Sequence, residues 1–222
     1  MEILLFIVIA LAVTAGIIYH FVQAAERRKA LLAWAQAHGL RFDPAKDRGL
    51  RQRFPEFKCL HRGDSRYAYN VMSGEPAGQS VLAFDYHYGT GAGKSRQEHY
   101  FSAVIVASPF PLKPLLIRRE GFFDKVKEFL GFDDIDFESA EFSRKFYVSS
   151  PDKRWAYDVI HQRMMEYLLA APHFSIQFDA EHLIVWRDKR LSPIEFSAAL
   201  DLVHGLLDRM PEYLVRQQQD LA

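Results

Sequence analysis

The apolar residues of this chain are distributed very unevenly, and the densest run lies at its beginning. The 20 residues from Ile3 to Val22 contain no Asp, Glu, Lys or Arg. At a helical rise of about 1.5 Å per residue, this run covers roughly 30 Å, the thickness of the hydrocarbon core of a bilayer. A buried helix of a globular domain carries a polar stripe, whereas this run is apolar on every side. The pattern predicts a transmembrane anchor within residues 1–24.

A cleavable signal peptide is the alternative interpretation of the same segment. Val22-Gln23-Ala24 satisfies the small-residue rule for a cleavage site. Signal peptides, however, begin with a basic stretch and have an apolar core of about 7–15 residues. This chain begins with Met1-Glu2 and its apolar run is longer, so we favour an uncleaved anchor.

The charges beside the apolar run indicate its orientation. Glu2 precedes the run, and the basic triplet Arg27, Arg28 and Lys29 follows it. Because Lys and Arg near a span prefer the cytoplasmic side, we expect the N-terminus outside and the C-terminal domain in the cytoplasm. The triplet forms a membrane flank that can contact anionic headgroups, for about 1 kcal/mol per charge. These observations predict a single-pass membrane protein with the lipid bilayer as its first partner.

The pattern over residues 25–54 predicts a juxtamembrane helix and a connector. Apolar residues continue at helical spacing until Gly39, which offers a C-terminal stop, and the polar stretch 43–54 follows. We expect Leu31 and Trp34 to pack on the domain and to couple it to the anchor.

The period of the pattern changes to two between Phe57 and Ile117. Apolar and polar residues alternate over 66–71, 82–88 and 101–105, with Gly-containing loops between them. Such runs are typical of an antiparallel meander. Proline cannot donate to a strand ladder, so Pro109 ends this region.

The second half mixes helices with short strands. We predict a helix over 122–130, a strand over 142–148, a helix capped by Ser150, a hairpin over 174–186, and a final helix opened by the capping box Ser192-Pro193-Ile194-Glu195. The fold class is therefore α+β: an N-terminal transmembrane helix followed by an antiparallel-sheet domain with two to three packed helices. The domain spans 55–210, and 211–222 form a polar tail.

The composition of the chain excludes several classes of function. The chain has 28 Lys and Arg against 28 Asp and Glu, so it lacks the basic surplus of a nucleic-acid binder. Its single cysteine, Cys59, excludes an internal disulfide and a Cys-rich zinc site.

Two stretches resemble cofactor-binding motifs but lack residues that these motifs require. The stretch Gly89–Ser95 resembles a phosphate-binding loop, but Tyr88 stands where its first glycine is required, and a strand follows instead of a helix. The acidic residues of 133–141 lack the glycine and the glutamate that a calcium loop needs at its sixth and twelfth positions. We therefore predict no nucleotide, no metal and no other cofactor.

One neighbourhood could support catalysis. Asp85 and His87 should share a strand face, with Glu98 and His99 near them across a hairpin. A carboxylate beside an imidazole is the minimum of a general-base pair, but no Ser or Cys lies in a nucleophile motif, and Cys59 lies in a strand-like run. We interpret the four residues as solvated or salt-bridged, with no catalytic residue assigned. The alternative keeps them as the site of a membrane-tethered enzyme, a hydrolase.

Taken together, the chain resembles an uncharacterised class of bacterial membrane-anchored proteins that carry a domain of unknown function. The resemblance covers most of the chain and lies in Gly39-Leu40-Arg41-Phe42, in the aromatic strand Val81–Tyr88, and in Asp134–Glu138 before Phe142-Ser143. It implies the architecture and a bacterial inner-membrane location, and it supplies no activity or site residue.

The function that these patterns favour is non-enzymatic. We expect the cytoplasmic domain to bind another membrane or cytoplasmic protein, or the membrane surface itself. A third possibility is a lipid- or small-ligand-binding module, which predicts a closed apolar cavity of several hundred Å³.

Overall fold

The structure is a computed structural model that describes residues 2–119 and 135–220. The helix expected over 122–130 lies outside the described residues, as do Asp133 and Asp134 of the acidic stretch.

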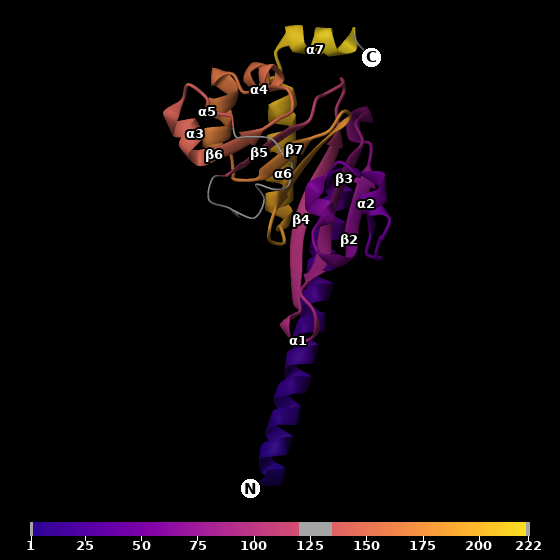
Figure 1. The fold of residues 1–222 in the computed structure, drawn as a ribbon. Helices are drawn as coiled ribbons and strands as arrows, with labels where there is room; N and C mark the ends of the chain where they lie inside the picture. The colour runs from indigo at the N-terminus through magenta and orange to yellow at the C-terminus, as the bar shows by residue number, and fades with distance from the viewer. Residues whose placement is uncertain (1, 120–134, 221–222) are drawn as a thin grey trace.

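A single eight-stranded antiparallel sheet organises the domain (Figure 1). The sheet confirms the predicted α+β class. Its strands lie in the order β1-β2-β3-β4-β8-β7-β5-β6, so the predicted meander β2-β3-β4 forms one half and the later strands form the other. Their bounds are β1 Arg41–Asp43, β2 Asp64–Gly74, β3 Val81–Thr90, β4 Gln97–Ala107, β5 Leu115–Arg119, β6 Phe146–Ser149, β7 Ser175–Phe178 and β8 His182–Arg187.

The described residues form more helices than the two or three that we expected. They are α1 Glu2–Ala37, α2 Leu50–Arg53, α3 Ala140–Lys145, α4 Lys153–Val159, α5 Gln162–Ala170, α6 Pro193–Leu207 and α7 Glu212–Gln219, with short 3₁₀ turns η1 Lys58–His61, η2 Pro76–Gly78 and η3 Gly93–Ser95. Several of these helices are only one or two turns long, and such turns leave little periodicity for a sequence pattern to show.

The two faces of the sheet bury alternate residues, as period two requires. On the first face, Ala83 and Val104 belong to the core cluster that includes Leu31 of α1 and Phe196 of α6. On the second face, Phe84, Tyr86 and Phe101 share a core cluster with Leu50, Phe57 and Leu60, from the segment that holds α2 and η1. The sheet is therefore the middle layer of three.

Local capping explains where the predicted boundaries were wrong. The strand expected over 142–148 begins only at Phe146, because the Ser139 side chain accepts from the Phe142 amide and starts α3 there. The next helix is capped by Asp152 rather than Ser150. The predicted capping box of Ser192 and Glu195 is confirmed at the start of α6. Within the expected polar tail, α7 forms and its Leu214 is buried.

α1 has two halves with different surroundings. Its C-terminal part packs on the domain through Leu31 and Trp34, as predicted, and the chain turns away at Gly39, whose φ of +68° suits glycine. Its N-terminal part projects away from the sheet (Figure 1), and the side chains of Phe6 and Phe21 are about 70% exposed. In the described part of the chain, no helix combines the length and the apolar character needed to cross a membrane. The transmembrane segment therefore stays a prediction.

Candidate functional site

Asp85 is the most deeply buried of the four residues singled out from the sequence. Its side chain has no exposed surface, and Arg27 of α1 approaches it with two donors, Nε at 2.9 Å and Nη2 at 2.6 Å. Asn70 Nδ2 at 2.9 Å and Ser102 Oγ at 2.5 Å complete its hydrogen bonds. The Ser102 hydroxyl in turn accepts from the Leu191 amide, so one carboxylate links α1, two strands of the meander and the loop before α6.

This ion pair changes the role predicted for Arg27. Its guanidinium is directed to the sheet instead of to headgroups, and only 20% of its side chain is exposed. Arg28 and Lys29, the other two residues of the predicted flank, are exposed. The predicted flank is therefore reduced to two cations, because Arg27 is engaged in fixing α1 to β3.

Two irregularities in β2 shape the region around Asp85. The β2–β3 register shifts between Asp64 and Tyr67, and again between Tyr69 and Met72. Asn70, within the second shift, has a φ of +50°, a left-handed conformation that asparagine tolerates better than most residues. There its amide reaches Asp85.

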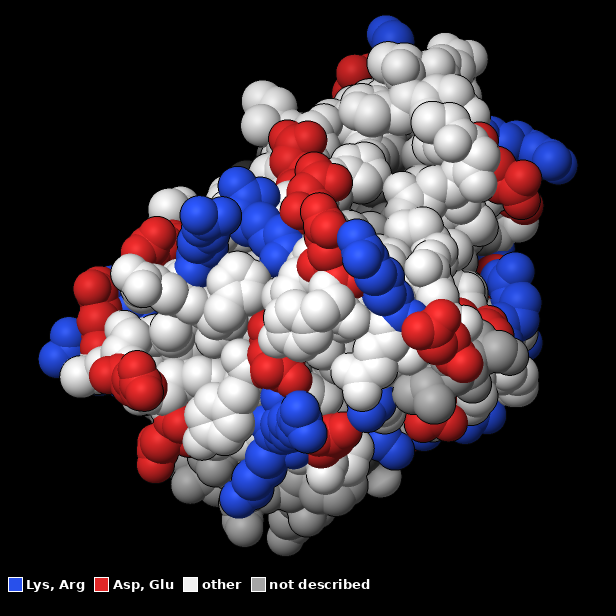
Figure 2. All heavy atoms as spheres, turned by 90° about the horizontal axis from the view of Figure 1, so that it is seen from above, with Lys and Arg blue, Asp and Glu red and all other residues white. Residues whose placement is uncertain are grey.

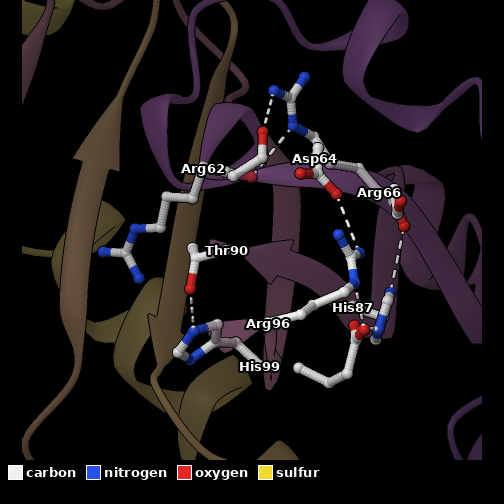
Figure 3. Close-up of polar contacts among 10 residues, drawn as sticks. Arg62, Asp64, Arg66, His87, Thr90, Arg96 and His99 are labelled. Atoms are coloured by element: carbon white, nitrogen blue, oxygen red, sulfur yellow. Dashed lines mark hydrogen bonds and ion pairs between the residues drawn. The ribbon is translucent and has the colours of Figure 1, made fainter. Parts of the chain in front are cut away.

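His87 and Glu98 form a second, separate pair on the same face of the sheet. The His87 Nε2 lies 2.6 Å from Glu98 Oε2, and its Nδ1 lies 3.1 Å from the carbonyl oxygen of Ser65. Both ring nitrogens of His87 therefore face oxygen atoms. Arg96 donates to Glu98 at 2.6 Å and to Asp64 at 2.9 Å, which places this arginine between two carboxylates (Figure 3).

These contacts make Glu98 a poor proton acceptor. The hydrogen bond from Arg96 lowers the pKa of Glu98, and the hydrogen bond from His87 lowers it further. The pKa of Asp64 is lowered by the same arginine. Both carboxylates are therefore ionised and engaged at neutral pH, whereas a general base needs a pKa near the working pH.

His99 lies apart from the other three residues. It occupies the opposite face of β4, where it pairs with Thr90 Oγ1 at 2.7 Å (Figure 3). Its ring stacks on Tyr88 with 4.8 Å between the ring centroids. The period-two pattern correctly placed Asp85 and His87 on one face, and it equally puts the adjacent residues Glu98 and His99 on opposite faces. The expectation that all four lie together was wrong.

The single thiol adds no nucleophile to this region. Cys59 is fully buried in η1, and this burial raises its pKa to about 12. A thiol of that kind is protonated at neutral pH and inert. Among the described residues, no three His, Cys, Asp or Glu side chains come close enough to share a metal ion.

A larger feature around His87 was not recognised from the sequence. It is an open cleft of about 610 Å³, which we call the cationic cleft. Its floor is a row of directly opposed rings on β2, β3 and β4, Tyr67, His87 and Tyr100, with centroids 4.4 and 5.1 Å apart. Its other lining residues are Lys46, Arg48, Ser65, Arg66, Arg96 and Glu98.

The cationic cleft depends on a long-range contact. Lys46 and Arg48 come from the connector, which the isolated bridge between Asp47 and Ala68 places along the edge of β2. The end of the domain seen from above looks different, since its Lys and Arg side chains alternate with Asp and Glu (Figure 2). The positive charge of the cleft is thus local in a chain whose net charge is zero.

A second hollow, of about 410 Å³, lies where β5 ends, β7 begins and β8 ends. Phe174 and Trp186 line it together with Arg119 and Arg187. It is open to solvent and has charged walls, so it differs from the closed apolar cavity that the ligand-binding alternative predicts.

The fold and the cleft define a class of architecture, an antiparallel α+β domain carried on one long helix. No protein-family model and no curated protein matches the chain. Among solved structures, it is similar to the crystal structure of the mycobacterial trehalose monomycolate transport factor A, TtfA, with a TM-score of 0.62 and 15% identity. The match covers 83% of this chain and 96% of that one. At this identity the similarity shows the fold alone.

Proposed function

We propose that this chain is a non-enzymatic, single-pass protein of the bacterial inner membrane. In this proposal, residues 3–22 cross the bilayer with the N-terminus outside. The α+β domain lies in the cytoplasm, at the membrane surface, where it binds its partner. The observation that carries the proposal is the division of α1. One half is fixed to the domain, by Trp34 against α6 and by the Arg27–Asp85 ion pair to β3, and the other half leaves the domain.

The second half exposes a large apolar surface. Among the side chains of this half that the structure describes, ten apolar ones are at least half exposed, and the apolar run around them contains no charged residue. Contiguous apolar surface of this extent marks a membrane or protein interaction site. The length of the run matches a bilayer, which favours lipid as the covering medium. The exposed side chains are Phe6, Ile7, Ile9, Leu11, Val13, Ile17, Ile18, Tyr19, Phe21 and Val22.

Two considerations favour a binding role over catalysis. Asp85 and Glu98 are each held in an ion pair by an arginine, His87 is hydrogen-bonded to Glu98, and Cys59 is buried. The structural neighbour bears the name of a transport factor, which is compatible with a non-catalytic use of this fold. Fold similarity by itself fixes no function, so the proposal depends on the division of α1.

Carbonate extraction of membranes tests the anchor. We expect the full chain with a C-terminal tag to stay in the membrane pellet. The variant Ile9→Arg/Val13→Arg should move to the soluble fraction, because each Arg near the centre of a span costs about 2.5–3.5 kcal/mol of insertion free energy. Ile194→Arg is the matched control: Ile194 is 82% exposed on α6, and its variant should stay in the pellet.

Fusions at the C-terminus test the orientation. A fluorescent protein should be bright and alkaline phosphatase inactive, because the domain faces the cytoplasm. Release of the wild-type chain by carbonate would refute the anchor, and active phosphatase beside a dark fluorophore would refute the orientation.

A further inference from the structure

Three of the four Lys and Arg residues that line the cationic cleft lack a carboxylate partner. Among the described residues, Lys46, Arg48 and Arg66 take part in no ion pair, whereas Arg96 is held by Asp64 and Glu98. The ammonium group of Lys46 lies 4.2 Å above the ring of Tyr67.

The hydrogen bonds of Arg66 bring no carboxylate to its guanidinium. Its guanidinium donates to the backbone carbonyls of Arg62 and Gly63 (Figure 3), which carry no formal charge. The positive charge of Arg66 also acts on a neighbouring group outside the cleft. The pKa of His61 is lowered first by burial and then by Arg51, Arg66 and Lys58.

An opening lined by three cations without a carboxylate partner among the described residues attracts anions. Arg offers a planar fork of donors that matches the oxygens of a phosphate, and Lys adds a point charge. The aromatic floor suits the same environment, since the amphipathic ring of Tyr is favoured at the level of lipid headgroups. The Tyr100 side chain is 38% exposed at this floor.

The cleft also lies at a defined height along α1. Arg27 follows the apolar run, which ends at Val22, by five residues, a rise of about 7.5 Å. Arg27 binds Asp85, and β3 continues from Asp85 toward the hairpin that points along the projecting half of α1 (Figure 1). Two strand residues cover about 6.6 Å, so His87 lies near the level at which the apolar run ends.

We propose that the cationic cleft binds the phosphate headgroup of an anionic phospholipid from the cytoplasmic leaflet. This inference rests on the proposed function, because α1 brings the cleft to headgroup level only when residues 3–22 lie in lipid. The shared chemistry is a phosphate ester recognised by Lys46, Arg48 and Arg66. We assign this phosphate ester to a membrane lipid rather than to a soluble compound.

Native mass spectrometry of the full chain in mild detergent tests the proposal. Phosphatidylglycerol should be retained in preference to phosphatidylcholine. The variant Lys46→Gln/Arg48→Gln/Arg66→Gln should bind phosphatidylglycerol about a hundredfold more weakly, because each cation near a headgroup contributes about fivefold. The charge-matched control replaces three exposed cations of α4 and α5, Lys153, Arg154 and Arg163, with Gln, and should bind like the wild type.

A variant that should strengthen binding serves as a second test, because misfolding of the triple variant would also weaken binding. Glu98 is the one acidic residue among the described residues that line the cleft, so Glu98→Gln should tighten phosphatidylglycerol binding about fivefold. The inference is overturned if the wild type shows no preference for phosphatidylglycerol, or if both triple variants weaken binding equally. It is also overturned if Glu98→Gln fails to tighten it.

The source of the phosphate is tested separately. Displacement of phosphatidylglycerol by millimolar inorganic phosphate would identify a soluble phosphate compound as the ligand and overturn the lipid assignment. Because these measurements use detergent, they can fail while carbonate extraction still supports the anchor, and the two failures can be told apart.

Discussion

Replacing Asp85 by Asn is expected to lower the melting temperature of the detergent-solubilised chain by about 6 to 20 °C. The Asp85 carboxylate is fully buried and accepts hydrogen bonds from Arg27, Asn70 and Ser102. Removing one partner of a buried pair leaves the other charge uncompensated and costs about 3–5 kcal/mol. For a domain of this size each kcal/mol corresponds to about 2–4 °C. Arg27 retains some solvent contact, so we expect a shift in the lower part of this range.

A double-mutant cycle separates the ion pair from the effects of either residue alone. Arg27→Met/Asp85→Asn should be less destabilised than the sum of the two single variants, because the unpaired charge is gone. Glu141→Gln is the exposed control: it breaks only the surface pair with Lys145 and should leave the melting temperature unchanged. An Asp85→Asn variant that melts with the wild type would show that Arg27 does not fix α1 to the sheet.

Trp34→Ala is expected to be equally damaging, with a loss of about 3–5 kcal/mol in the free energy of unfolding. Trp34 is 6% exposed and joins α1 to α6. Its ring stacks on His38 at 4.3 Å and lies 5.4 Å from Phe196, and its Nε1 donates to Ser197 Oγ at 2.9 Å. Thermal unfolding of the purified chain measures the loss.

Two companion variants define the cause of that loss. Trp34→Phe keeps an aromatic ring and should lose about 1 kcal/mol, the contribution of one hydrogen bond. Leu32→Ala, on the same helix but 40% exposed, should lose clearly less than Trp34→Ala. Equal losses for Leu32→Ala and Trp34→Ala would mean that α1 is not docked through this side chain.

Much of the fold could be predicted because its signals are local. Alternation predicted the meander, and the Ser192–Glu195 capping box placed the last long helix. The order of the strands could not be predicted, since β8 pairs with β4 across 75 or more residues of chain and no local pattern encodes that pairing. α3 was missed because the pattern from Phe142 to Val148 is typical of a strand. The helix forms there because the Ser139 side chain caps its first turn.

The site was predicted in part, for the same reason. Period two placed Asp85 and His87 on one face, but the partner of Asp85 is 58 residues away on α1. The cationic cleft combines strand residues with Lys46 and Arg48 of the connector, which the Asp47–Ala68 bridge brings to the sheet. Contacts of this kind are made by the fold and leave no spacing in the sequence.

The unbroken course of α1 has a mechanical consequence. Its free half continues, within one helix from Glu2 to Ala37, from the half that Arg27 and Trp34 fasten to the domain. A span that is too long for a thinner bilayer tilts to stay immersed. With residues 3–22 in lipid, a tilt of α1 would change the angle between the sheet and the membrane plane. That angle would then depend on the local thickness of the bilayer.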